Sequence, residues 1–471
     1  MSTSPSFFDR LNSWARRSIT LKLIIIGLMI LFLMIPALML DGLISDRQRL
    51  RDAAQEEVAS KWGMEQMVGG PVISVPYSYD KLSADGKTST SNSGYAHFLP
   101  NVIDVQGQLN PEERYRGIFV VVLYNTKLQI RGNFDGFNAA ALNLPENSLQ
   151  WENALFSIGI SDMTGVQSAI DLRFGDVPLS LGPGTVTNEI FQSGASVPVA
   201  ITGQEQEIDF SFALDLNGSS ALYFRPFGKR TTVTMTGGWA NPSFDGGFLP
   251  QSREITANGF TANWEILQLN RNYPQQGTGS FVPSSSTGYS NSGVLGLINS
   301  YNYVDPSDGY ITSGDLFGLR LLLPVDEYKK TYRSTNFAIL FIFITFLTFF
   351  FIEVLNKRRV HPIQYLLIGA AIILFYVLLL SISEHLLFDA AYWISCVAIV
   401  SLITMYSWFI LRNLKLTLMV AVILFILYVF FYSLLQLQDY ALLVGSLGLL
   451  LILGAIMWLT RNIDWYALNR S

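Results

Sequence analysis

The chain has 471 residues, of which 50% are hydrophobic and 14% charged, and its formal net charge at pH 7 is −5. Soluble domains usually carry about 25% charged residues, so the deficit indicates segments buried in lipid. A single cysteine, Cys396, excludes an internal disulfide and a cysteine-based zinc site, and the lack of basic runs outside the membrane flanks argues against nucleic-acid binding.

The first apolar run extends from Leu23 to Leu40. At about 1.5 Å per residue it nearly spans a hydrocarbon core of about 30 Å. The run is preceded by the basic residues Arg10, Arg16, Arg17 and Lys22. A signal peptide can begin in the same way, but this run is long and no small-x-small cleavage site follows it. We therefore expect a cytoplasmic N-terminus over residues 1–20 and an uncleaved transmembrane helix over residues 21–42.

Residues 43–334 form the predicted extracytoplasmic domain. Its first part, 43–68, is charged and alanine-rich and predicts a helical stalk that continues the first span, with Gly69-Gly70-Pro71 ending the helix. Short alternating apolar runs follow, broken by turn-forming residues, and these are typical of strands. The predicted strands are Val72–Tyr77, Ile118–Tyr124, Lys127–Gly132, Leu155–Ile160, Ile208–Leu216, Ala221–Arg225 and Thr231–Thr236.

Turn-forming and loop-forming residues separate the predicted strands of this domain. Asn217-Gly218 lies between two predicted strands and indicates a hairpin, because both central positions of a type I′ turn need a positive φ. Two stretches rich in Ser, Gly and Asn, Ser83–Gly94 and Gln275–Gly293, are predicted surface loops. We expect a large antiparallel β-sandwich.

The second apolar block, residues 335–460, is predicted to be a bundle of five transmembrane helices. The expected spans are 336–355, 362–381, 391–411, 416–435 and 441–459. Basic joints at Lys357-Arg358-Arg359, at Arg412 with Lys415, and at Arg461 with Arg470 alternate with joints that are not basic. By the positive-inside rule the basic joints are cytoplasmic. Both termini, including the tail 461–471, are therefore expected in the cytoplasm, and the sandwich outside it.

Several stretches along the chain are family signatures. They are Val68-Gly69-Gly70-Pro71, His97-Phe98-Leu99-Pro100, Asn241-Pro242-Ser243-Phe244, His361-Pro362-Ile363-Gln364-Tyr365-Leu366-Leu367 and the terminal Leu459–Tyr466. On these residues the chain resembles the CreD family of bacterial inner-membrane proteins, usually labelled cell-envelope integrity proteins. The resemblance implies an inner membrane of Gram-negative bacteria and a link to envelope stress, but no catalytic residue. Many relatives have histidine where this chain has Asn241, so a general metal or acid/base role there is not expected.

Polar residues at the ends of the predicted spans are the main site candidates. His361, Gln364 and Tyr365 begin the third span, where Pro362 suits the first helical turn. Glu353, near the end of the second span, is expected to pair with Lys357. On the outer side the candidates are Glu384, His385, Asp389 and Asp439. These four could bind protons or a cation, or could belong to solvated loops that orient the helices.

Other candidates lie beyond the spans. Arg461 and Asp464 are one turn apart and can pair at the interface or dock a partner. In the sandwich, Trp239 and Trp264 are candidates for stacking against a glycan. His97 is expected to be a packed or surface residue rather than a ligand. We find no phosphate-binding loop, His-Glu-x-x-His motif or Gly-x-Ser-x-Gly motif, and predict no catalytic residue, metal or cofactor.

The leading hypothesis is a non-enzymatic envelope-stress protein of the bacterial inner membrane. Its periplasmic sandwich would bind an envelope component, such as peptidoglycan, lipopolysaccharide or lipid, or a membrane-protein partner. One alternative is a transporter or lipid-handling protein with a polar cavity or groove in the bundle, lined by Gln364, Tyr365, Ser381, Glu384 and His385. A second alternative is a glycan-active enzyme, which rests on fold analogy alone.

Overall fold

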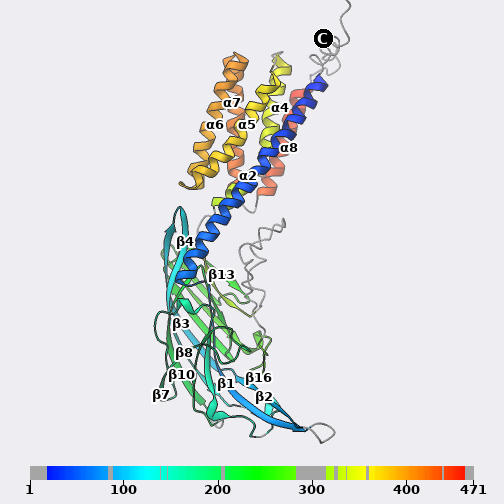
Figure 1. Ribbon diagram of the computed structural model, residues 1–471. Coiled ribbons are helices and arrows are strands. Elements are labelled where there is room, and N and C mark those ends of the chain that lie inside the picture. Colours follow the sequence, from blue (N-terminus) through cyan, green and yellow to red (C-terminus); the bar gives the residue numbers. More distant parts are fainter. Residues whose placement is uncertain are drawn as a thin grey trace, which may run out of the picture. The chain divides into compact units, whose positions relative to one another are not determined.

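A computed structural model describes most of the chain as two compact units (Figure 1). The described residues are 19–82, 89–137, 139–145, 147–202, 207–282, 315–322, 327–335, 337–356, 360–437 and 440–461. The helical unit comprises Met1–Gln48 and Val325–Ser471, and the β-rich unit comprises Arg49–Pro324. The predicted fold class, apolar helices at both ends of the chain around a large β domain, is confirmed.

The apolar segments form long helices because each is continuously hydrophobic over a length that can cross a bilayer. These helices are α2 (Ile19–Trp62), α4 (Ala338–Asn356), α5 (Pro362–Ser383), α6 (Phe388–Leu411), α7 (Leu414–Gln436) and α8 (Ala441–Thr460), and a short polar helix, α3 (Glu327–Thr335), precedes α4. By length and composition, five helical stretches of the described chain could cross a membrane: Leu21–Trp62, Lys330–Val354, Pro362–Ser383, Phe388–Leu411 and Leu414–Gln436. Helix α8 adds a shorter apolar stretch, Leu443–Trp458.

The first span and the stalk are one helix, α2, as predicted, but it ends at Trp62 rather than near residue 68. Gly63 terminates it with φ of +145°, a conformation that favours glycine, and a Cβ there would lie 2.6 Å from the Asn217 carbonyl oxygen. The predicted helix end at Gly69-Gly70-Pro71 is wrong, since these residues lie within strand β1.

The β-rich unit contains two sheets. The first has nine strands, in the order β13-β17-β11-β1-β5-β9-β8, with β2 beside β1 and β16 beside β2. These are β1 (Gln66–Leu82), β2 (Ser89–Phe98), β5 (Leu155–Ile160), β8 (Gly182–Pro183), β9 (Gly194–Pro198), β11 (Ala221–Arg225), β13 (Pro242–Gly246), β16 (Gln276–Thr278) and β17 (Phe317–Leu321).

The second sheet has eight strands, in the order β14-β15-β12-β3-β4-β10-β6-β7. They are β3 (Val102–Arg116), β4 (Phe119–Asp135), β6 (Asp171–Phe174), β7 (Val177–Ser180), β10 (Glu207–Ser219), β12 (Arg230–Gly237), β14 (Ser252–Thr256) and β15 (Gly259–Leu267). Pairing is antiparallel except between β1 and β11 and between β3 and β12.

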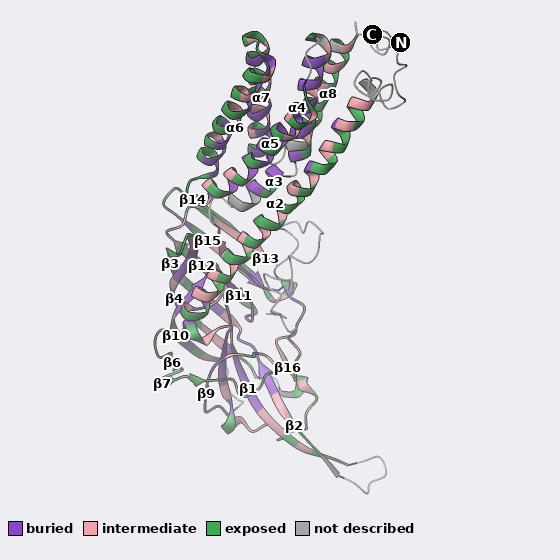
Figure 2. Ribbon diagram, turned by 45° about the horizontal axis from the view of Figure 1, so that its top comes forward, coloured by how far each residue is buried: buried purple, intermediate pink, exposed green. Residues whose placement is uncertain are grey.

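The two sheets enclose one hydrophobic core, so the sandwich is confirmed (Figure 2). Aromatic rings join the sheets: Phe156 of β5 lies 5.8 Å from Phe210 of β10, and Trp264 of β15 lies 5.9 Å from Phe317 of β17, between ring centroids. Full burial of each such side chain stabilises the fold by about 1.5–3 kcal/mol.

The predicted hairpin at Asn217-Gly218 is wrong. Both residues lie inside β10, paired with β4, and the chain then changes sheets to enter β11. The turn is made by Ser220, with φ of +58°, and the Asn217 side chain is held by Asn125 across the strands. The loop prediction for Ser83–Gly94 is also wrong over 89–94, which belong to β2; its first residues lie outside the described chain.

Candidate functional site

A buried carboxylate lies where α4 leads into α5. Glu353 accepts hydrogen bonds from the Val360 amide at 3.0 Å and the Tyr365 hydroxyl at 3.3 Å, and it pairs with the Lys22 ammonium of α2. The side chain of Glu353 is 6% exposed and that of Lys22 33%. The predicted partner, Lys357, lies outside the described residues; the observed partner, Lys22, comes from the other end of the chain.

His361 and Gln364 cap helix α5. The His361 Nδ1 atom accepts from the Ile363 amide at 3.3 Å, and the His361 amide donates to the Gln364 side chain at 2.9 Å. Pro362 occupies the first turn, as predicted. These two candidates therefore have a structural role, and only Tyr365 of the predicted trio reaches the buried carboxylate.

The opposite end of α5 carries a second polar group. Glu384 pairs with Arg47 of α2 at 3.2 Å, and the carboxylate of Asp389 in α6 accepts from the side-chain amide of Gln436 in α7 at 2.7 Å. His385 is exposed beside them, and Asp439 lies outside the described residues. Tyr365 and Glu384 thus lie at opposite ends of a helix about 30 Å long, in two separate clusters.

The middle of the bundle contains buried hydroxyls that the sequence analysis did not single out. Tyr376 of α5, Tyr392 and Ser395 of α6, and Tyr428 of α7 are all at most 1% exposed. The Tyr392 hydroxyl donates to the Tyr428 carbonyl at 2.8 Å. In the described chain the hydroxyls of Tyr376, Ser395 and Tyr428 have no hydrogen-bond partner. A search for tyrosine and serine at helical spacing within the spans would have found them.

The tail candidates are only partly described. The Arg461 guanidinium lies 5.0 Å from the Trp458 ring centroid, which fits an interfacial anchor. Asp464, its predicted partner, lies outside the described residues.

The two tryptophan candidates in the β-rich unit differ in exposure. Trp264 is fully buried in the core, where its indole donates to the Phe248 carbonyl at 3.2 Å. Its ring therefore has no free face for a glycan, and the structure places it as a core residue. Trp239 is half-buried and donates to the Leu322 carbonyl at 3.0 Å.

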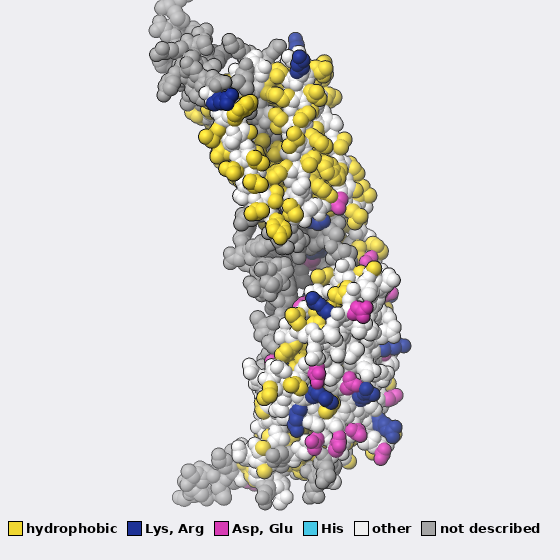
Figure 3. Space-filling view, turned by 180° about the vertical axis from the view of Figure 1, so that it is seen from behind, with side chains coloured by type: hydrophobic (Ala, Val, Ile, Leu, Met, Phe, Trp, Pro, Cys, Tyr) yellow, Lys and Arg dark blue, Asp and Glu magenta, His cyan; other side chains and the backbone are white. Residues whose placement is uncertain are grey.

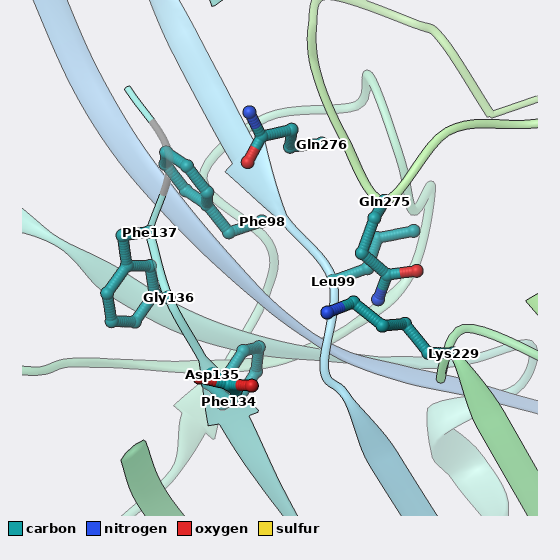
Figure 4. A pocket seen from close by; sticks show the side chains of 9 residues that line it. All are labelled: Phe98, Leu99, Phe134, Asp135, Gly136, Phe137, Lys229, Gln275 and Gln276. Atoms are coloured by element: carbon teal, nitrogen blue, oxygen red, sulfur yellow. The ribbon is translucent and has the colours of Figure 1, made fainter. Parts of the chain in front are cut away.

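A cavity of about 300 Å³ opens where the two sheets meet near Phe137 (Figure 4). Its lining residues are Phe98, Leu99, Phe134, Asp135, Gly136, Phe137, Lys229, Gln275 and Gln276. The exposed side chains of Asp135 and Lys229 provide opposite charges on an aromatic surface. Gln275 is held in place by the Phe227 carbonyl at 3.4 Å and by Arg271 and the Pro100 carbonyl.

His97 lies inside the β-rich unit between two polar partners. Its Nδ1 atom is 2.8 Å from the Ser74 hydroxyl, directly across the β1–β2 pair, and its Nε2 atom is 2.8 Å from the Glu189 carboxylate. Burial lowers the pKa of His97, and the hydrogen bond and charge of Glu189 oppose this shift.

Ser74, His97 and Glu189 have the residue types of a hydrolase triad, but a substrate cannot reach the Ser74 hydroxyl. Ser74 is 4% exposed and His97 is not exposed at all, so a substrate carbonyl could not approach the hydroxyl. Within the described residues, no group of three or more His, Cys, Asp or Glu side chains could hold a metal ion.

Comparison with known proteins identifies the family that this chain belongs to. The family model described as "Inner membrane protein CreD" matches residues 18–466. The Inner membrane protein CreD of Escherichia coli (strain K12) is 30% identical over 432 residues, an alignment that covers 91% of this chain and 89% of that protein. The match includes the apolar helices at both ends and the β-rich unit between them. The chain therefore belongs to the CreD family of inner-membrane proteins.

Proposed function

We propose that this protein acts in envelope integrity by binding an envelope component through its β-rich domain, on the periplasmic side of the membrane, without catalysing a reaction. The observation that carries the proposal is the cavity of Figure 4, where aromatic side chains meet one ammonium and one carboxylate. The basic joints between the apolar helices support the periplasmic placement.

The lining favours a ligand that contains a sugar ring. The Phe137 ring, partly buried against the core, can pack against the C–H face of a sugar, while Lys229 and Asp135 can bind its hydroxyl and amide groups. A volume of about 300 Å³ fits a single sugar or amino-acid unit of a larger polymer. We therefore place peptidoglycan fragments ahead of lipopolysaccharide and phospholipid.

The test is ligand-dependent thermal stabilisation of the full-length protein in detergent. Disaccharide-peptide fragments of peptidoglycan, lipopolysaccharide, short-chain phospholipid and magnesium chloride would be titrated separately. We expect a saturable rise in Tm with the disaccharide-peptide alone, and its loss in Lys229→Gln and Asp135→Asn.

The matched control is Lys127→Gln, which removes the charge of an exposed lysine on β4 that does not line the cavity. It should leave the ligand effect intact. A folded wild-type protein that shows no saturable shift with any of the four probes would overturn the proposal.

A second candidate function is passage of a small polar solute through the helical unit. It is favoured by the buried hydroxyls of Tyr376, Ser395 and Tyr428, which, like those of Thr345 and Thr404, lack partners in the described chain, because such groups usually bind water or a polar ligand. Stopped-flow solute uptake into proteoliposomes tests it. Uptake slowed by Tyr376→Phe or Tyr428→Phe would support it, and uptake equal to that of protein-free liposomes would refute it.

A further inference from the structure

Arg225 is a buried arginine at the end of strand β11. Its strand neighbour Phe224 contacts Phe317 in the core at 6.0 Å between ring centroids. Side chains alternate along a strand, so Arg225 and Phe224 lie on opposite faces of the first sheet. Arg225 is only 5% exposed. The charged side chain is therefore almost completely removed from water.

Aromatic side chains help to exclude water from the surroundings of Arg225. The residue paired with Arg225 on β1 is Gly69, which has no side chain. The rings of Phe191 and Phe227 pack over that glycine, and their centroids are 5.6 Å apart. The neighbourhood of Arg225 is thus partly apolar, which makes an unpaired charge unfavourable.

The hydrogen-bonding state of Arg225 is the key observation. Its Nε and Nη2 atoms are buried and have no hydrogen-bond partner in the part of the chain that the structure describes. These two nitrogens are adjacent on one edge of the guanidinium and point their N–H bonds in parallel. That edge is the one that binds both oxygens of a carboxylate or phosphate at once.

A second buried arginine adds positive charge. Arg271 is 6% exposed and uses its two Nη groups on the carbonyls of Tyr273, at 2.7 Å, and Phe227, at 3.2 Å. Asp315 is the buried acidic residue of the described β-rich chain, and its negative charge acts on both arginines. Burial lowers the pKa of both arginines, while Tyr273 and Asp315 oppose the shift.

We propose that Arg225, supported by the charge of Arg271, forms a binding site for one oxyanion, either a carboxylate or a phosphate group. The anion would accept hydrogen bonds from Nε and Nη2 of Arg225. Its negative charge would balance the net positive charge of a region that holds two arginines and one carboxylate. None of Arg225, Arg271 and Asp315 lines the cavity of Figure 4, so the site goes beyond the proposed function.

The experiment uses the full-length protein in detergent at constant ionic strength. Sodium acetate, sodium phosphate, the dipeptide alanyl-alanine and the C-terminal amide of that dipeptide are titrated against a sodium chloride reference. We expect a saturable rise in Tm of about 3 °C with acetate, phosphate or the free dipeptide, and none with the amide. The arm with the highest affinity distinguishes a free phosphate from a peptide carboxylate as the natural ligand.

Two variants test the geometry. Arg225→Lys keeps the charge but removes the parallel pair of N–H groups, so the anion affinity should fall at least about tenfold. Asp315→Asn removes a repelling carboxylate, so the affinity should rise. Lys127→Gln is the control on an exposed lysine.

The proposal is overturned if the wild-type protein shows no saturable anion effect, or if Arg225→Lys binds as tightly as wild type. If Arg225→Lys does not fold, Asp315→Asn decides: weaker anion binding in that variant would also overturn it. Acetate and phosphate contain no sugar, so this result is independent of the test of the cavity.

Discussion

In the helical unit the outer surface is apolar and charged groups lie near the helix ends, whereas in the β-rich unit charged side chains are scattered over the surface (Figure 3). The interior of the β-rich unit is rich in aromatic side chains. Each arrangement has exceptions that are buried and polar. In the helical unit they include Glu353, which pairs with the half-buried Lys22, and the hydroxyls of Tyr376, Ser395 and Tyr428. In the β-rich unit they include His97, Arg225 and Arg271.

The difference follows from the solvent of each unit. Lipid is as apolar as a leucine side chain, so helices gain little from hiding apolar surface from each other, and polar contacts and close packing have to position them. A domain in water gains most of its stability from burial of apolar area. Buried polar groups are therefore expected to orient the helical unit, but to mark candidate binding sites in the β-rich unit.

The largest effect should follow a change in the aromatic core. Trp264→Ala removes a fully buried indole that contacts Phe317 and Phe244, and should lower the free energy of unfolding of the β-rich unit by about 3–5 kcal/mol. Urea titration of the full chain in detergent, followed by pulse proteolysis, measures this. The half-buried Trp239→Ala should lose only about 1 kcal/mol. Equal losses would mean that the core is not where the stability of this unit originates.

The next effect concerns the ion pair between the half-buried Lys22 and the buried Glu353 of the helical unit. Lys22→Met leaves the Glu353 carboxylate buried without this counter-charge and should destabilise the helices by about 2 kcal/mol. Unfolding by dodecyl sulfate, followed by helical circular dichroism, measures the change. Lys22→Arg should be tolerated, and the double variant Lys22→Met/Glu353→Gln should regain most of the loss. If the double variant is no better than the single one, the pair does not orient α2.

Much of the fold was accessible from the sequence because it depends on local patterns. Continuous hydropathy predicted α4 to α8 to within a few residues, and period-two alternation gave β5 and β11 with their observed bounds. The Asn217-Gly218 turn failed because the hairpin rule assumes that consecutive strands pair. Here β10 pairs with β4, and the chain moves to the other sheet at Ser220. The choice between those outcomes depends on distant strands.

The candidate sites were less accessible, since they join residues that are far apart in the chain. Lys22 and Glu353 are 331 positions apart, and no local spacing relates them. Arg225 was expected only as the last residue of a strand, but it is buried, beside Gly69 and the ring of Phe191 from other parts of the chain. By contrast, the capping role of His361 and Gln364 was open to prediction, because a helix start is encoded within four residues.

A smaller effect should appear as a dependence of stability on pH. The folded state holds His97 with a pKa below its ordinary value of 6.5, so the unfolded state binds more protons once the pH falls below that value. The stability contributed by neutral His97 is complete above about pH 6.5 and is lost as the pH falls, by at most about 1.4 kcal/mol per pH unit. Urea titrations from pH 7.5 to 5.5 on wild type and His97→Gln measure it. A difference between the two proteins that does not change with pH would show that His97 does not contribute in this way.

The smallest effect should come from an exposed ion pair of the β-rich unit, which completes the contrast with Lys22 and Glu353. Arg131 donates to one oxygen of Asp104 at 2.7 and 2.9 Å, but the arginine side chain is 66% exposed. Water competes for both partners and the two side chains lose rotamer freedom, so Arg131→Gln should change the free energy of unfolding by less than about 1 kcal/mol. Urea titrations at low and high sodium chloride should show that even this difference decreases with salt. A loss as large as that of Lys22→Met would mean that burial is not what separates the ion pairs of the two units.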